Sequence, residues 1–220
     1  MLGIVFLVRL GFWQLERLEW RRGENAVKAA EINAAPLSLN NLPTAIDLPA
    51  MWNRQATAVG QYDLAGQLLV RSQNYEGQPG VYLLVPLVLE GGDVAVLVHR
   101  GWLPSAEAAN AADYHQTGVV SVTGRIQLSE GLSGGRVTEI TADNELFRID
   151  VPAIADHLGY PILPVYLLEE PPPPPDRELP YQLTADLTLD EGDHLSYAIQ
   201  WFIFAAMLTG IYTYLVAKSR

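Results

Sequence analysis

The strongest candidate for chemistry in this sequence is a histidine at the start of its most apolar run. His194 precedes the segment Tyr197–Val216, in which no residue is charged. At 100° per residue on a helix, several aromatic and small side chains share its face: Tyr197, Ala198, Trp201, Ala205, Leu208 and Tyr212. A neutral imidazole is a good metal ligand. We therefore expect His194, with Tyr197 and Trp201 beside it, to form part of a binding site.

A second set of polar and aromatic side chains lies near the N-terminus. On a helix these residues occupy an arc of roughly 120°: Trp13, Gln14, Arg17, Trp20 and Arg21. Guanidinium groups form paired hydrogen bonds with carboxylates. Arg17 and Arg21 are therefore candidates to hold an acidic ligand, with Trp13 and Gln14 next to them.

The segment that follows His194 has the composition of a transmembrane helix. Twenty helical residues span roughly 30 Å, the thickness of the hydrocarbon layer of a bilayer. Lys218 and Arg220 come directly after Tyr197–Val216, and such charges favour a cytoplasmic C-terminus. We expect a transmembrane helix over 194–217; the alternative is a buried helix of a large soluble core.

The N-terminal apolar run, 1–15, is shorter and contains Arg9 and Gln14. Fifteen helical residues cover only about 22 Å. No basic region precedes the run and no small-residue cleavage site follows it, so it is not a typical signal peptide. We interpret 1–22 as an incomplete first transmembrane helix with its outer end. Two such helices would place the middle of the chain on the outer side of the membrane.

The membrane setting gives simpler interpretations of both sets of side chains. A single histidine at a membrane boundary is most often an interfacial polar residue. Tryptophans such as Trp13, Trp20 and Trp201 are typical of aromatic belts, and arginines at a boundary can bind lipid phosphate. These interpretations stay open beside the binding site.

The middle of the chain, 23–193, is predicted to be a mainly antiparallel β domain or small barrel. Short β-type runs bounded by Gly and Pro lie at Ala56–Tyr62, Gln67–Ser72, Val81–Leu89, Val94–His99, Val119–Gln127 and Val165–Leu168. The third and fourth should pair as a hairpin, with Pro86 making the third an edge or bulged strand. Helices are expected over 24–35 and Val151–Leu158. A Pro-rich linker, 171–180, includes the stiff spacer Pro171–Pro175. The fold class is therefore membrane α+β.

Composition excludes several kinds of function. The net charge of −11 argues against nucleic acid as a partner. Without any cysteine, the chain has no disulfide, no thiolate metal site and no cysteine nucleophile. Gly131, Ser133 and Gly135 match a hydrolase nucleophile pattern, but the following residues do not read as the helix that it needs. The acidic run before His194 is consecutive rather than on one helical face, so a solvated loop is favoured over a metal site. No set of residues predicts an enzymatic step.

Three blocks of sequence occur in a characteristic order: LGFWQLERLEWRR at Leu10–Arg22, VHRGWLP at Val98–Pro104 and HLSYAIQWF at His194–Phe202. Gly60–Tyr62 and Pro86–Leu87 add two shorter blocks. Together they resemble the surfeit locus protein 1 family of cytochrome c oxidase assembly factors over nearly the whole chain. Two positions depart from the family: His99 stands where asparagine is usual, and Arg9 interrupts a short first helix.

The resemblance implies a membrane-anchored chaperone with an outward-facing domain, in a bacterial plasma membrane or a mitochondrial inner membrane. Its expected role is maturation of cytochrome c oxidase subunit I, through binding and delivery of haem a. His194 matches the histidine implicated in haem binding in some bacterial members and is the expected ligand of the haem iron. Subunit I, the bilayer and the machinery of haem a synthesis are the expected partners. From the residues, the macrocycle would lie over Ala198 and Ala205 and against Trp201.

One rival interpretation uses the same anchors without a cofactor. A membrane scaffold for oxidase subunits would be colourless and would still bind subunit I. The sequence does not separate this scaffold from a haem-handling factor, and a membrane-anchored serine hydrolase is a remote third interpretation.

Overall fold

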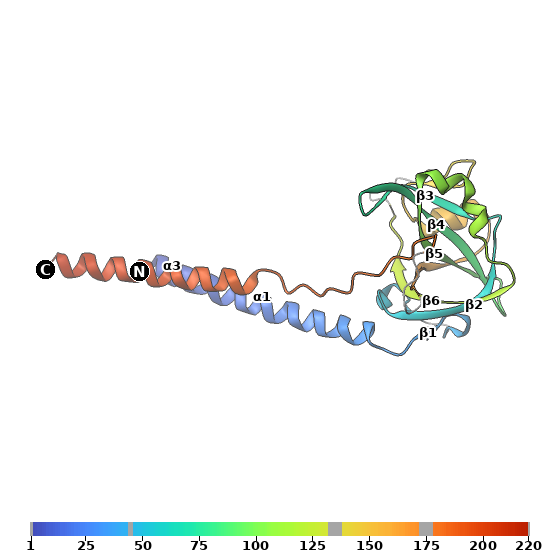
Figure 1. Cartoon of the computed structure of the whole chain (residues 1–220). Helices are drawn as coiled ribbons and strands as arrows, with labels where there is room; N and C mark the ends of the chain where they lie inside the picture. The colour runs from blue at the N-terminus through green and yellow to red at the C-terminus, as the bar shows by residue number, and fades with distance from the viewer. Residues whose placement is uncertain (1, 44–45, 132–137, 172–177, 220) are drawn as a thin grey trace. The chain divides into compact units, whose positions relative to one another are not determined.

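The computed structural model describes residues 2–43, 46–131, 138–171 and 178–219. It divides into two compact units, one of residues 1–30 with 188–220 and one of residues 31–187. The elements in chain order (Figure 1) are α1 Leu2–Ile32, β1 Leu37–Ser38, η1 Leu39–Asn41, η2 Pro49–Met51, β2 Gln55–Tyr62, β3 Leu68–Tyr75, β4 Gln78–Leu89, β5 Ala95–Pro104, η3 Ser105–Tyr114, β6 Val119–Leu128, β7 Glu145–Leu146, α2 Val151–Leu158, β8 Ile162–Glu169 and α3 His194–Lys218.

The unit of residues 31–187 is a β barrel, as the sequence predicts. Five strands follow one another in the order β2, β6, β8, β5 and β4, and the ring closes because β4 also pairs with β2. Strands β3 and β7 extend the sheet from β4, and β1 extends it from β2. Within the ring, only β5 and β8 run parallel; the other pairs are antiparallel.

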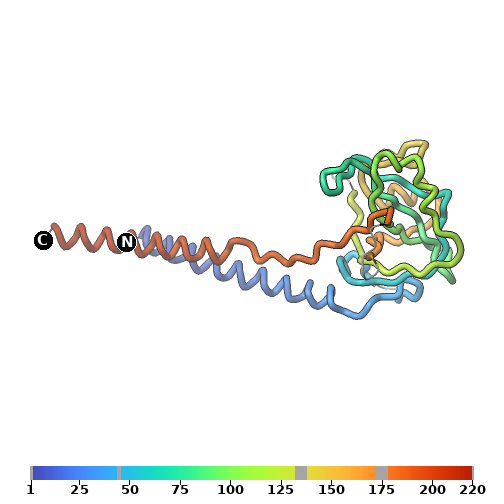
Figure 2. Tube along the Cα trace, viewed as in Figure 1, coloured from blue at the N-terminus to red at the C-terminus, as the bar shows by residue number. Residues whose placement is uncertain are grey.

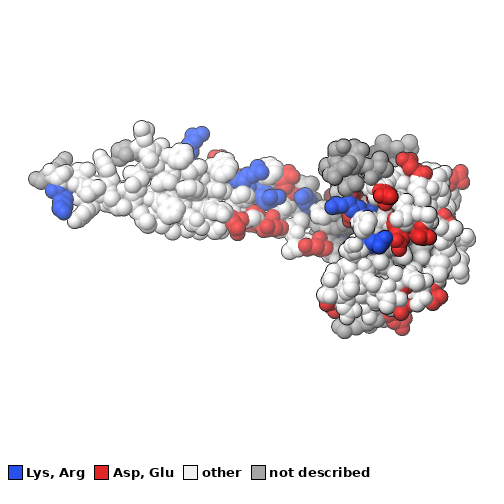
Figure 3. Space-filling model, turned by 90° about the horizontal axis from the view of Figure 1, so that it is seen from above, with Lys and Arg blue, Asp and Glu red and all other residues white. Residues whose placement is uncertain are grey.

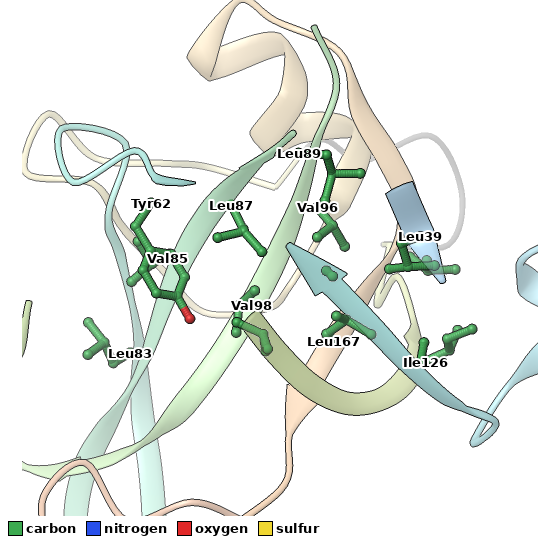
Figure 4. Close-up of a cluster of buried hydrophobic side chains, with 14 of the residues drawn as sticks. Leu39, Tyr62, Leu83, Val85, Leu87, Leu89, Val96, Val98, Ile126 and Leu167 are labelled. Atoms are coloured by element: carbon green, nitrogen blue, oxygen red, sulfur yellow. The ribbon is translucent and has the colours of Figure 1, made fainter. Parts of the chain in front are cut away.

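Strands β4 and β5 are apolar on both faces because each face packs into a different core. Successive side chains of a strand point to opposite faces. Leu83, Val85 and Leu87 lie in the interior of the barrel (Figure 4), whereas Leu84 packs outside it, together with Ile154 of α2. This double burial explains why the two strands read as almost continuous apolar runs, and each buried aliphatic side chain contributes roughly 1.5–3 kcal/mol.

Pro86 does not make β4 an edge strand, so that part of the prediction is wrong. β4 pairs with β5 along its length. On its other side it pairs with β3 up to Leu84 and with β2 from Leu87 onward. Pro86 falls between these two partners, where the missing N–H is not needed and its carbonyl accepts from the N–H of Asp63. The predicted bulge is present nearby, between Leu83 and Leu84 opposite β5.

The predicted helix Val151–Leu158 is confirmed as α2. Asp150 begins it, because its carboxylate accepts from the N–H of Ala153 and satisfies one of the free donors of the first turn. Gly159 ends it in a left-handed conformation with φ 77°, which glycine adopts without strain.

The other unit consists of two long helices and the segment that leads into the second. The helix expected over 24–35 is the continuation of α1, which ends at Ile32. Figure 2 shows α1 and α3 running in opposite directions. Among the described residues, α3 is the one helix both long and apolar enough to cross a membrane; it has 25 residues, and its most apolar stretch has a mean hydropathy of 1.5. Only 6% of its most apolar stretch is buried, which does not fit the core helix of a soluble protein.

Charge is distributed unequally between the two units. Residues 31–187 contain seven basic and nineteen acidic residues, whereas the rest of the chain contains seven basic and six acidic ones. Acidic side chains recur over the face of the barrel that Figure 3 shows, while long stretches of the helices carry none. The net negative charge of the protein therefore belongs to the β domain.

Candidate functional site at the α1 and α3 helices

The two helices contact each other through small and aromatic side chains. A Cβ added to Gly11 would lie 2.6 Å from the ring of Phe202, so this ring rests directly on the backbone of α1. Phe12 packs edge-on against the same ring, with centroids 5.4 Å apart. Ala198 and Ala205 of α3 are buried, as are Gly11 and Leu18 of α1. The two buried residues of each helix are thus seven positions apart, the heptad spacing of a coiled-coil contact.

His194 is joined to α1 by a hydrogen bond with Gln14. Its Nδ1 lies 2.9 Å from Oε1 of Gln14, and Gln14 is flanked on α1 by the buried Gly11 and Leu18. The opposite nitrogen, Nε2, has no hydrogen-bond partner among the described residues. It lies beside Gly192, where an added Cβ would stand 3.5 Å away. One nitrogen of the ring is therefore fixed by α1 and the other is accessible.

Beyond His194, the pair continues with polar contacts. The guanidinium of Arg22 pairs with the carboxylate of Glu191 at 2.9 Å, and the amide of Asn25 donates to the carbonyl of Asp190. Arg21 differs from Arg22, because its Nε is buried and has no hydrogen-bond partner in the described part of the chain. A buried guanidinium donor without an acceptor is costly, and it is a suitable partner for an acidic group.

Helical periodicity places the remaining predicted residues on one side of this contact. With Gly11 and Ala198 marking the centre, Arg17 and Arg21 of α1 turn to the same side as Tyr197 and Trp201 of α3. Tyr197 is about half exposed and Trp201 is partly buried. Phe12 and Phe202 occupy the opposite side.

Trp13 and Trp20 turn away from α3. Trp13 is 53% exposed and Trp20 is 49% exposed. The guanidinium of Arg17 lies 4.0 Å from the ring of Trp20, a cation–π contact within α1. This placement is the one expected of belt residues, and neither tryptophan contacts His194 in the described structure.

The surface of α3 on which a macrocycle was expected to lie, over Ala198 and Ala205, is not accessible. Ala198 is 1% exposed and Ala205 is 5% exposed, because α1 packs on the face that carries them. A flat ligand therefore cannot lie over both alanines while the helices are paired. The open surface next to His194 is instead the side of Tyr197 and Trp201.

A second polar cluster lies in the β domain and centres on Arg100 of β5. Arg100 is 5% exposed. Its Nη1 donates to the carbonyl of Tyr114 at 2.6 Å, its Nε lies 3.6 Å from a carboxylate oxygen of Glu169, and it stands over the ring of Tyr62. Burial raises the pKa of Tyr62 and that of Glu169. The buried bond from Arg100 to the carbonyl of Tyr114 indicates that this side chain stabilises the fold of the β domain.

Gly101 and Trp102, next to Arg100, contact Tyr181 in the segment that follows β8. Trp102 and Tyr181 exchange two backbone hydrogen bonds of 2.8 Å and stack their rings with centroids 5.9 Å apart. Gly101 has φ 139°, and a Cβ there would lie 2.6 Å from the carbonyl oxygen of Tyr181. Only glycine allows this approach. Tyr181 was not singled out in the sequence, because nothing in its neighbourhood marks it as the partner of Trp102.

Comparison with known proteins decides the family. The sequence model of the SURF1 family matches residues 1–206. The chain belongs to the SURF1 family. Surfeit locus protein 1 of Arabidopsis thaliana is 26% identical over 254 residues, covering 91% of this chain and 72% of that protein. A SURF1-like protein of Rickettsia bellii is 26% identical over 225 residues, covering 96% and 87%. Cytochrome oxidase assembly protein SHY1 of Saccharomyces cerevisiae is 25% identical over 114 residues, covering 49% and 29%.

Family membership confirms the resemblance found in the sequence blocks, and the structure locates these blocks in two places. Leu10–Arg22 and His194–Phe202 face each other in the helix pair of this SURF1 family member, where they supply Gln14 and His194. Val98–Pro104 lies in β5 and supplies the buried residues Arg100 and Trp102. The blocks that resembled one family thus belong to one candidate site and one structural cluster.

The competing chemical sites gain no support from the described residues. The hydrolase pattern at Gly131–Gly135 falls mostly outside them, because 132–137 are not described. In the described ranges, no three His, Cys, Asp or Glu side chains are placed to share a metal ion. Of the acidic residues before His194, Glu191 pairs with Arg22 and Asp190 accepts from the N–H of Gly192.

Proposed function

We propose that this chain is a membrane-anchored assembly factor for haem-copper cytochrome c oxidase, and that it binds haem a and delivers it to subunit I. Membership of the SURF1 family supports the assembly role, since one relative is a cytochrome oxidase assembly protein. The action is binding and transfer rather than catalysis. The observation that carries the haem proposal is the accessible Nε2 of His194 at the end of the paired helices.

The anchor is α3, with the apolar part of α1 beside it in the bilayer. The 25 residues of α3 span about 37 Å, enough for the hydrocarbon layer. Lys218 at its end favours a cytoplasmic or matrix C-terminus, and the barrel would then lie on the outer side. Because the chain has no cysteine, single cysteines at Glu107 and Lys218 test this orientation. Only the first should react with an impermeant maleimide in intact cells; the reverse pattern would contradict the topology.

The donor groups near His194 suit a haem. Iron in haem takes a neutral imidazole as axial ligand, and His194 offers Nε2. Carboxylates of the propionate type form strong hydrogen bonds with guanidinium groups. Arg21 carries a buried Nε without an acceptor and follows Gln14 by seven residues, about 10 Å along α1. Tyr197 and Trp201 supply aromatic surface on the same side. These four residues would hold the haem and keep it at the outer boundary of the membrane.

The optical spectrum of the purified protein tests this proposal. The full chain is purified from cells that make haem a, as wild type, as His194→Ala and as His157→Ala. His157 lies exposed on α2 and binds Asn144, so it is a matched histidine control. We expect a Soret band in the wild type and in His157→Ala and its loss in His194→Ala. Haem with an unchanged spectrum in His194→Ala would remove the ligand assignment.

A cofactor-free scaffold is the second candidate, and the buried state of Ala198 and Ala205 favours it. In this case the paired helices bind subunit I without any haem. Co-purification of subunit I with the His194→Ala variant separates the two. The scaffold predicts undiminished capture of subunit I and a colourless wild-type protein at every expression level. Haem delivery predicts a coloured wild type whose captured subunit I contains more haem a than the subunit I captured by the variant.

A further inference from the structure

In the orientation that the structure gives the Gln14 amide, its hydrogen bond with His194 assigns the imidazole proton to one nitrogen. The atom that faces Nδ1 is the amide oxygen Oε1 of Gln14, at 2.9 Å. An amide oxygen only accepts hydrogen bonds. With Oε1 opposite it, Nδ1 donates, and a neutral imidazole has one N–H. In the neutral ring the proton is on Nδ1 and the lone pair is on Nε2.

The position of Gln14 is itself fixed by the packing of the two helices. Gly11 and Leu18 flank it at spacings of three and four residues and are the buried residues of α1. The ring of Phe202 rests on Gly11, which sets the register of α3 against α1. Gln14 therefore cannot slide relative to His194 without disturbing this contact.

The free nitrogen of the ring has the surroundings that a ligand needs. Nε2 has no hydrogen-bond partner in the described part of the chain and lies beside Gly192. A ligating histidine commonly donates its other N–H to a carbonyl or carboxylate oxygen, which orients the ring and raises its basicity. Gln14 and His194, which are 180 residues apart in sequence, have this arrangement across the two helices.

We propose that Gln14 is a positioning residue, which holds His194 in the Nδ1–H tautomer and presents Nε2 to the haem iron. The identity of the ligand rests on the proposed function, whereas the tautomer does not. Gln14 then acts through His194 and does not touch the haem. This role differs from the place that the sequence predicts for Gln14, beside Arg17 and Arg21 in the set of residues that would hold the ligand.

The tautomer is measured without any haem. The full chain, labelled with 15N-histidine, is studied by NMR in detergent micelles at pH 8, above the ordinary imidazole pKa of about 6.5. The His194→Ala spectrum assigns the signals. We expect the proton on Nδ1 in the wild type and a mixture rich in Nε2–H in Gln14→Leu. An Nε2–H tautomer in the wild type would overturn the proposal.

Haem a titration tests the consequence for binding. Gln14→Leu should weaken binding roughly 10–100-fold, the usual effect of losing such an outer partner. Gln14→Glu keeps an acceptor oxygen and should stay within about threefold of the wild type. Gln200→Leu, which removes an exposed glutamine from α3, is the matched control and should bind as the wild type does. Equal affinity of Gln14→Leu and wild type would overturn the positioning role.

Two further measurements keep the outcomes distinct. Thiol cross-linking between cysteines at Arg22 and Glu191 reports whether the helices stay paired, so weak haem binding with unchanged cross-linking is a loss of positioning rather than of structure. If His194→Ala binds haem as tightly as the wild type, the iron ligand is not His194, and both the haem site of the proposed function and the presentation of Nε2 are wrong. If His194→Ala loses haem but Gln14→Leu binds it as tightly as the wild type, His194 remains the iron ligand and the positioning role of Gln14 alone is wrong.

Discussion

The contacts that stabilise the barrel differ from those that stabilise the helix pair. In the barrel, a ring of five strands encloses one core while α2 covers a second, so each strand is fixed on several sides. The two helices meet through a single line of contacts in which Gly11, Leu18, Ala198 and Ala205 are the buried positions. A substitution in the barrel should therefore change folding, whereas one in the helix pair should change how the helices meet.

The largest effect is expected where the backbone of the barrel is most crowded. Gly101→Ala places a Cβ 2.6 Å from the carbonyl oxygen of Tyr181, at φ 139°, and should lower the free energy of unfolding by about 3 kcal/mol. Urea unfolding of the solubilised full chain, followed by tryptophan fluorescence, measures this loss. Gly77→Ala is the control, because Gly77 also has a positive φ but nothing lies near it. Its cost should be about 1 kcal/mol. Equal costs would mean that the approach of Tyr181 does not matter.

A smaller effect in the barrel should depend on pH. His99 is 3% exposed and lies 4.5 Å from the ring of Tyr82, and burial lowers its pKa to about 4. The unfolded chain then binds a proton that the folded chain does not, so this stability is present above pH 6.5 and is lost as pH falls toward 4. Between pH 8 and pH 5 the wild type should lose about 2 kcal/mol more than His99→Asn. Parallel curves for the two proteins would contradict this. Because Glu169 is present in both, its raised pKa does not affect the difference.

The helix pair should respond to added volume at one position and not at another. Gly11→Ala forces the ring of Phe202 to move and should weaken the pairing by roughly 1–2 kcal/mol. Gly23→Ala, on the same helix, has open space around it. Cross-linking between cysteines at Arg22 and Glu191 should fall several-fold in the first variant only, with the urea midpoint of the barrel unchanged in both. A shift of that midpoint in Gly11→Ala would show that the two regions are not independent.

The smallest effect is expected at the exposed ion pair of the helices. The side chains of Arg22 and Glu191 are about half exposed, and such pairs add little to stability. Arg22→Gln should leave the midpoint of thermal unfolding of the full chain unchanged within error at physiological salt. A clear drop in that midpoint would mean that the end of the helix pair at Arg22 depends on charge more than on the packing at Gly11.

The sequence predicts the barrel strands because their pattern is local. Gly and Pro bound each run, and the β4–β5 hairpin forms as expected. The prediction that Pro86 marks an edge strand is wrong because two further strands, β2 and β3, pair with β4 on either side of Pro86. Their order along β4 is a property of the closed sheet. No local pattern contains that order.

The candidate site is only partly predictable for the same reason. Periodicity places His194 and Gln14 on the correct faces of their helices. It cannot show that Ala198 and Ala205 are covered, since that depends on the register set by Gly11 and Phe202. The sequence likewise does not show that Gln14 contacts His194. The proposal that Gln14 positions His194 depends on the 2.9 Å distance between them.

The hydrogen bonds and ring stacking between Trp102 and Tyr181 have a practical consequence for isolating the β domain. A soluble fragment that stops after β8 would leave the N–H and carbonyl of Trp102 without their partners and would uncover an indole that is now 1% exposed. Asn53 would also lose the carbonyl of Asp186. A fragment intended for crystallisation should therefore end after Asp186, and shorter fragments should aggregate through the uncovered indole.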